Sequence, residues 1–120
     1  MINFVRNLFS KPKYKIHRSK KDNNFYFSLI AKNGEIILTS EGYLARDGAI
    51  NGINSVSIHG KNITNFEIRE SKDKKYYFIL IARNNKIIGT SEMYNQKDSA
   101  LNGIESVMSC CTTNVIKFDE

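Results

Sequence analysis

The chain has 120 residues, of which 41% are hydrophobic and 25% charged, values close to those of ordinary globular domains. A chain of this length buries roughly two-thirds of the surface that its unfolded form exposes, so we expect one compact domain that folds without a metal or a disulfide. The formal charge of +6 comes from residues 1–21, which carry seven basic side chains and no acid; the other 99 residues carry 11 basic and 12 acidic side chains. The near-neutral remainder disfavours a fold that docks nucleic acid over a broad basic face.

Compartment signals are few. No apolar run approaches the ~20 residues needed to span a bilayer, and residues 1–9 are too short for a secretory signal and are interrupted by Arg6. The adjacent Cys110 and Cys111 are poorly placed to bridge each other, which is typical of reduced thiols. We therefore expect a cytoplasmic protein.

Residues 1–13 are predicted to be a basic amphipathic extension. Ile2, Val5 and Phe9 would share one face of a short helix, which Pro12 and the Ser10-Lys11 before it would end. Such an arm either docks on the domain or attaches the protein to an anionic surface, nucleic acid or lipid. The candidate polyanion-binding residues are Arg6, Lys11, Lys13, Lys15, Arg18, Lys20 and Lys21.

The first structural unit spans residues 14–62. Alternating apolar residues predict strands at 14–18, 25–31 and 36–39, and Asn33-Gly34 is the preferred pair for a two-residue hairpin turn. A helix follows, with Ala49, Ile53 and Val56 on one face. One such meander with one helix leaves apolar surface and strand edges open.

The second unit, residues 63–120, repeats the first about 51 positions later. Strands are expected at 66–69, 76–82 and 87–88, followed by a helix with Ala100, Ile104 and Val107 on its inner face. We expect Asn95 to cap this helix, and a last strand at 115–118. The prediction is an α+β fold, a tandem duplication of a three-stranded antiparallel meander and a helix, with the halves packed about a pseudo-two-fold axis and sharing one sheet or one core.

Three motifs, each present twice, give the chain a family resemblance. They are Phe27-x-Leu29-x-Ala31-x-Asn33-Gly34, Thr39-Ser40-Glu41-x-Tyr43 and Asn51-Gly52-Ile53-x-Ser55-Val56, with counterparts beginning at Phe78, Thr90 and Asn102. Over residues 14–111 the chain resembles the DUF1508, or UPF0339, family, also called YegP-like. The resemblance implies two antiparallel-strand-plus-helix units and implies no activity. The second copy has Asn85 where the first copy has Gly34, and this is a departure from the pattern.

The links between the third strand and the helix of each unit are the candidate ligand site. Serine, glutamate and tyrosine can together donate and accept hydrogen bonds to a polar ligand; the alternative is that the hydroxyls satisfy the link's own backbone and the tyrosines pack under the helices. The candidates are Ser40, Glu41, Tyr43, Ser91, Glu92 and Tyr94.

Other chemistry is not indicated. His17 and His59 have no carboxylate or cysteine at ligand spacing, so we expect no metal, and the absence of a glycine-rich phosphate loop argues against a nucleotide cofactor. Gly52 and Gly103 fall inside the predicted helices, where glycine costs about 1 kcal/mol relative to alanine. Either a close helix approach or a backbone-lined ligand contact requires them.

These observations favour a non-enzymatic binding module that is a monomer with its repeats paired intramolecularly. An unknown protein partner is one expectation, with nucleic acid or a membrane surface contacted only through the N-terminal arm. The alternatives are attachment to an anionic surface by that arm, and a small-molecule site or enzyme at the paired links.

Overall fold

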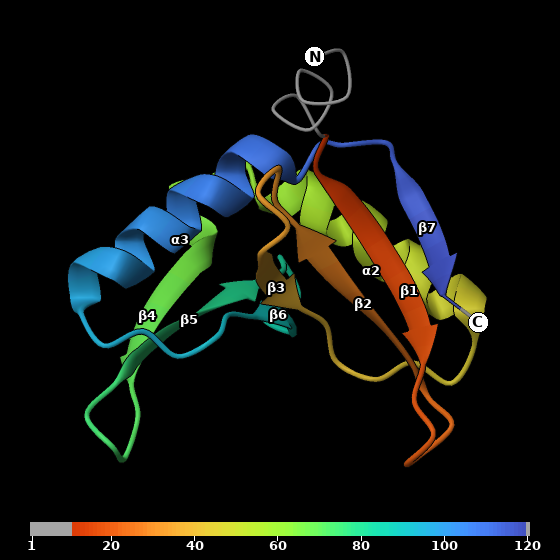
Figure 1. Ribbon diagram of the computed structural model, residues 1–120, viewed down its shortest axis with the longest axis horizontal. Helices are drawn as coiled ribbons and strands as arrows, with labels where there is room; N and C mark the ends of the chain where they lie inside the picture. The colour runs from red at the N-terminus through yellow and green to blue at the C-terminus, as the bar shows by residue number, and fades with distance from the viewer. Residues whose placement is uncertain (1–10, 120) are drawn as a thin grey trace, which may run out of the picture.

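The computed structural model describes residues 11–119, which form one sheet and two long helices (Figure 1). Its elements are β1 (Lys13–Arg18), β2 (Phe25–Ile30), β3 (Ile36–Thr39), α2 (Arg46–His59), the 3-10 turn η1 (Ile63–Asn65), β4 (Phe66–Glu70), β5 (Tyr76–Ile81), β6 (Ile87–Thr90), α3 (Lys97–Cys110) and β7 (Ile116–Asp119). The sheet order is β4-β5-β6-β3-β2-β1-β7. The expected α+β duplication sharing one sheet is confirmed.

The two hairpin turns lie where the sequence predicted, but the expected two-residue type is wrong. The Ala31 N–H donates to the Glu35 carbonyl and the Gly34 N–H to the Ala31 carbonyl, so residues 32–34 form a three-residue loop in which only Gly34 has a positive φ. Gly34 has a φ of 88° and Asn85, its counterpart, a φ of 69°. Asparagine tolerates this left-handed conformation better than most side chains, so the substitution leaves the turn intact. Each hairpin then places the third strand of its unit beside the second.

The halves meet between β3 and β6, where Thr39 lies opposite Thr90. Leu38 and Gly89 precede these threonines at equivalent positions of the two repeats, but one is a large side chain and the other has none. A Cβ added to Gly89 would lie 2.5 Å from Cδ2 of Leu38. The leucine of the first repeat therefore fills the space that the glycine of the second repeat leaves at the pseudo-axis.

The core is common to both repeats. Strands of both units contact each helix: α2 reaches from β1 to β5, and α3 reaches from β4 to β2. Fully buried residues include Phe27, Leu29, Phe78 and Leu80, in one hydrophobic cluster with the inner faces of α2 and α3. Neither unit has an interior of its own.

The helix glycines are sites of close packing. A Cβ on Gly103 would lie 2.5 Å from the Tyr94 hydroxyl and 2.9 Å from the Phe78 ring. Gly52 stands in the same relation to Tyr43 and Phe27. The structure thus supports close helix approach as the reason for both glycines.

The predicted helix cap was wrong. α3 begins at Lys97, so its cap position is Gln96 and not Asn95, and no side chain caps it. α2 starts in the same way after Ala45, again without a side-chain cap. The capping prediction placed the helix start one residue too early.

The predicted last strand, β7, runs parallel to β1, at one end of the sheet (Figure 1). It is held at its base by the Tyr14 hydroxyl, which donates to the Cys111 carbonyl at 2.6 Å, and by the Thr113 hydroxyl, which donates to the Pro12 carbonyl at 2.8 Å. β7 therefore covers the outer edge of β1.

Candidate functional site

The link serines are bound to the backbone around them. Ser40 Oγ accepts from the Phe27 N–H at 2.8 Å and donates to the Glu41 carbonyl at 2.8 Å. Ser91 Oγ makes the same two contacts, with the Phe78 N–H and the Glu92 carbonyl. Both serines are buried, so each hydroxyl ties its link to the second strand of its own unit.

The link tyrosines pack under the helices. Tyr43 stacks on Phe27 and Tyr94 on Phe78, with ring centroids 6.2 and 6.3 Å apart. Burial raises the pKa of both phenols above the ordinary value. Glu41 and Glu92 are exposed beside them. This is the packing that the alternative interpretation of the links describes, and ligand binding there stays a prediction.

The candidate polyanion-binding residues are dispersed. Arg6 lies outside the described residues, and Lys11 and Lys21 are exposed. Lys13 and Lys15 alternate along β1 with the buried Tyr14 and Ile16, and Lys15 Nζ lies 3.6 Å from an Asp119 carboxylate oxygen. Only Arg18 and Lys20 line the pocket described next.

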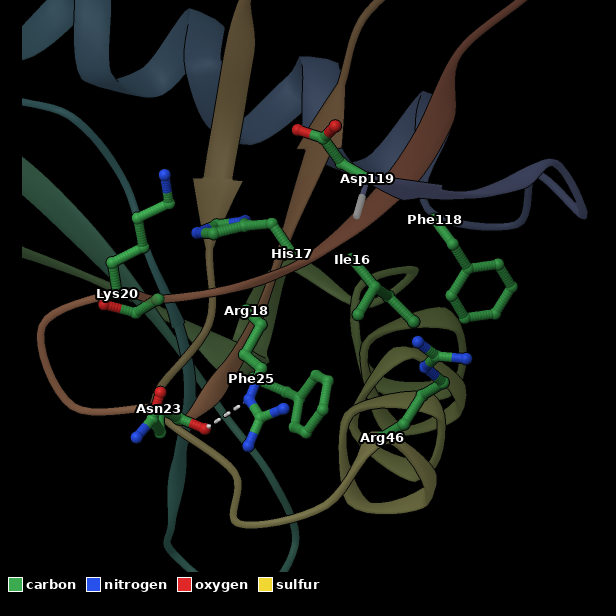
Figure 2. Close-up of a pocket in the computed structure, with 10 residues that line it drawn as sticks. Ile16, His17, Arg18, Lys20, Asn23, Phe25, Arg46, Phe118 and Asp119 are labelled. Atoms are coloured by element: carbon green, nitrogen blue, oxygen red, sulfur yellow. Dashed lines mark hydrogen bonds between the residues drawn. The ribbon is translucent and has the colours of Figure 1, made fainter.

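A pocket of about 270 Å³ opens at the end of the first repeat, where the β1–β2 turn, the start of α2 and β7 come together (Figure 2). Its lining combines apolar side chains with charged and polar ones. It is lined by Ile16, His17, Arg18, Ser19, Lys20, Asn23, Phe25, Arg46, Phe118 and Asp119.

One side of this pocket is an arginine–aromatic cluster made of Arg18, Phe25, Arg46 and Phe118. The Arg18 guanidinium carbon lies 5.4 Å from the Phe25 ring centroid; that of Arg46 lies 5.9 Å from Phe25 and 4.9 Å from Phe118. Figure 2 shows all four side chains together beside the first turn of α2, whereas Asp119 points away from them.

Strand register assembles this cluster. Arg18 pairs with Phe25 across β1 and β2, and Ile16 pairs with Phe118 across β1 and β7. Because side chains opposite each other in a sheet share a face, Arg18, Phe25 and Phe118 all point to the side that α2 covers. Arg46, the first residue of α2, enters between the two rings.

The electrostatics of the pocket favour an anion. Arg18, Lys20 and Arg46 bring three cationic side chains to the lining, and among residues 11–119 its one acid, Asp119, lies 3.6 Å from Lys15 Nζ. Guanidinium groups bind carboxylates and phosphates with directed hydrogen bonds, and the phenylalanine rings offer a flat apolar wall. The arrangement can hold an anionic group attached to an apolar one.

Three of the four residues of this cluster were missed from the sequence. Arg18 belonged to the predicted basic set, but Phe25, Arg46 and Phe118 lie 7, 28 and 100 positions further along the chain. A usable signal was present at Arg46, because no such arginine stands at the start of the second helix, where the equivalent residue is Lys97. Phe118 could be assigned to the cluster only from the pairing of β7 with β1.

A family model described as a domain of unknown function, DUF1508, matches the chain twice, over residues 20–67 and 71–117. The chain belongs to the DUF1508 family. Its relatives include a UPF0339 protein of Mannheimia succiniciproducens, 50% identical over 81% of this chain and 86% of the relative, and the UPF0339 protein YegP of Yersinia pestis, 40% identical over 87% and 92%.

Solved DUF1508 structures share the fold. The solution structure of Escherichia coli YegP, a protein of unknown function, matches with a TM-score of 0.86 and 37% identity over 92% of this chain and 94% of that one. The UPF0339 protein of Shewanella oneidensis matches with a TM-score of 0.83 and 42% identity over 90% and 91%. These names indicate no activity. Within residues 11–119 no helix has the length and apolar character needed to cross a membrane.

Proposed function

We propose that this DUF1508 protein is a non-catalytic binding module that takes an anionic ligand in the pocket of the first repeat. The observation that carries the proposal is the placement of two guanidinium groups, from elements 28 residues apart, against the same phenylalanine ring. Two guanidinium groups this close to one ring can both direct N–H donors toward the same anion.

The ligand we propose carries a phosphate or carboxylate on a flat apolar group. Arg18 and Arg46 would contact the anionic group, with Lys20 also in the lining, and the Phe118 ring, 46% exposed, would cover the apolar part. The other polar groups of the lining are engaged locally: Ser19 Oγ accepts from the Lys21 N–H, and the His17 ring stacks on Tyr26. This supports binding without a chemical step.

The test is a titration of the full chain with phenyl phosphate, followed by backbone amide NMR. We expect shifts at the amides of Arg18, Phe25, Arg46 and Phe118, and weaker binding of inorganic phosphate and of phenol alone. Exchanging Arg46 for glutamine should weaken phenyl phosphate binding about tenfold. Lys97→Gln, the matched change in the second repeat, should leave it unchanged. Absence of shifts in the pocket at millimolar phenyl phosphate would overturn the proposal.

A second candidate is attachment to an anionic surface by residues 1–13, supported by the lack of any acid in residues 1–21. Its measurement is salt-dependent retention on heparin and on vesicles containing phosphatidylserine. Deleting residues 1–12 should abolish retention, whereas Arg46→Gln should preserve it. Unchanged retention of the shortened chain would exclude the arm.

A further inference from the structure

The first strands of the two units, β1 and β4, differ in whether another strand covers their outer edge. β1 and β4 are equivalent, and each pairs on its inner side with the next strand of its unit. β1 also receives β7 on its outer side, whereas β4 ends the sheet and has no outer neighbour among residues 11–119. Figure 1 shows β7 and β4 at opposite ends of the sheet.

The missing neighbour leaves apolar surface uncovered. Tyr14 and Ile16 of β1 are 0% and 1% exposed. Their counterparts in β4, Phe66 and Ile68, are only partly buried. An open strand edge also presents backbone N–H and C=O groups that pair readily with an added strand.

We propose that β4 accepts an extended segment of a partner protein, bound parallel to it, in which an apolar, a basic, an apolar and an acidic residue follow one another. This site is separate from the anion pocket and goes beyond the function proposed for it. The mode is strand addition, in which backbone hydrogen bonds supply affinity and alternate side chains supply specificity.

The pairing of β7 with β1 supplies the template. Tyr14 lies beside Ile116, Lys15 beside Lys117, Ile16 beside Phe118 and His17 beside Asp119. Transferred to β4, the same register sets the apolar guest residues beside Phe66 and Ile68. Their burial would give β4 the coverage that β1 already has.

Charge decides the remaining two positions of the guest. In that register its second residue lies beside Glu67 and its fourth beside Arg69, so a basic and then an acidic residue are favoured. Glu67 and Arg69 already contact each other at 2.6 Å on the exposed face of β4. The guest would extend this pair into an alternating set of four charges.

The chain's own last strand has this pattern, Ile116-Lys117-Phe118-Asp119. On β1, Lys117 lies beside Lys15, a like charge, and Asp119 reaches Lys15 only diagonally. On β4 the equivalent neighbours would both be of opposite charge. A peptide with the sequence of residues 112–119 is therefore a suitable probe for a partner of this chemistry.

The experiment titrates that peptide into the intact, isotopically labelled protein, whose β1 edge is already filled. We expect amide shifts confined to residues 66–70. Reversing the peptide charges with K117E and D119K should weaken binding at least fivefold. With the E67K/R69E protein the preference should reverse, so that the charge-reversed peptide binds more tightly. Lys15→Glu, a matched change at the other edge, should leave binding of either peptide to β4 unchanged.

Three results of the titration would overturn the proposal. They are no shift at residues 66–70, no reversal of preference with E67K/R69E, and shifts centred on residues 14–17 and 116–119, which would show displacement of β7 from β1. Sedimentation of the protein without peptide is the remaining control. Concentration-dependent dimerisation lost with E67K/R69E would assign the edge to a second copy of this chain and overturn the assignment to a separate partner.

Discussion

The two repeats agree in their interior and differ at their surface. Phe27 and Phe78, and Leu29 and Leu80, are all fully buried at equivalent positions, and the serines of the two links make identical hydrogen bonds. A duplicated core therefore does not require a duplicated surface. It provides one body on which two ends can carry different chemistry.

The difference at the ends is specific. Where the first repeat has Arg18, Phe25 and Arg46, the second has Glu70, Tyr76 and Lys97. The first end is basic and closed by β7, and the second is mixed in charge and open. The comparison teaches that binding chemistry is to be sought where the two repeats differ in sequence. Substitutions at equivalent positions measure how far the shared interior extends.

The largest effect is expected at the pseudo-axis. Leu38→Ala should lower the free energy of unfolding by about 2–5 kcal/mol because it empties a fully buried site. Gly89→Ala should cost about 1–3 kcal/mol because its Cβ would overlap Leu38. The reciprocal L38G/G89L chain should be more stable than the sum of the separate L38G and G89L changes predicts, measured by urea denaturation. Strict additivity would show that the two positions do not share one space.

A smaller effect is expected at the helix glycines. Gly103→Ala gains about 1 kcal/mol of helix propensity but loses more by crowding Tyr94 and Phe78, so we expect a net loss of about 1–2 kcal/mol. Gly52→Ala should behave alike, since its surroundings are equivalent. Combining G103A with Y94F, which removes the nearest atom, should recover part of the loss in thermal unfolding. A rise in melting temperature with G103A alone would contradict close packing.

Tyr14 makes the stability of the first repeat depend on pH in a way that the second repeat lacks, because its counterpart there, Phe66, has no hydroxyl. Burial, with Cys111 and Cys110 nearby, raises the Tyr14 pKa above its ordinary value near 10. A raised pKa favours the neutral hydroxyl in the folded state, so its contribution is complete below pH 10 and is lost as pH rises above that value. Tyr14→Phe should cost about 1 kcal/mol at pH 7 and show a shallower fall in stability between pH 10 and 12. Equal slopes for both chains would rule out Tyr14 as the titrating group.

The smallest effect compares the two helix starts. Arg46→Ala removes contacts with Phe25 and Phe118 worth about 0.5–1 kcal/mol each at exposed sites, whereas Lys97→Ala removes none of this kind from the described contacts. We expect R46A alone to lower the melting temperature, by a few degrees, and to increase amide exchange in residues 116–119. Equal effects of the two changes would remove the cluster as a support of β7.

The fold was predictable because each half repeats its signals. The Asn33-Gly34 turn, the alternation through Phe27 and Leu29, and the helical spacing of Ala49 and Ile53 are local patterns, and their second occurrence removed the ambiguity of a single match. The helix start was misplaced because Asn95 is a good cap by type, while the link geometry placed Gln96 at that position instead.

The pocket was not predictable as a whole because it depends on contacts distant in sequence. Arg18 stood out through charge, but its value comes from Phe25 across the strand pair and from Arg46 at a helix start. Phe118 belongs to the cluster only because β7 pairs with β1, and no turn motif or sequence periodicity predicts that pairing. For the link serines the opposite is true. Their repeated motif was visible in the sequence, and the structure adds the backbone groups to which they bind.

The pairing of β7 with β1 has a consequence for the order of events during synthesis. The first strand ends at Arg18 and its outer neighbour ends at Asp119, about 100 residues later. At ribosomal rates of roughly 5–20 residues per second, the edge of β1 waits about 5–20 seconds for the strand that covers it. A nascent chain halted before residue 116 would therefore expose a strand edge at each end of its sheet, and the arrival of β7 would be the step that closes the first of them.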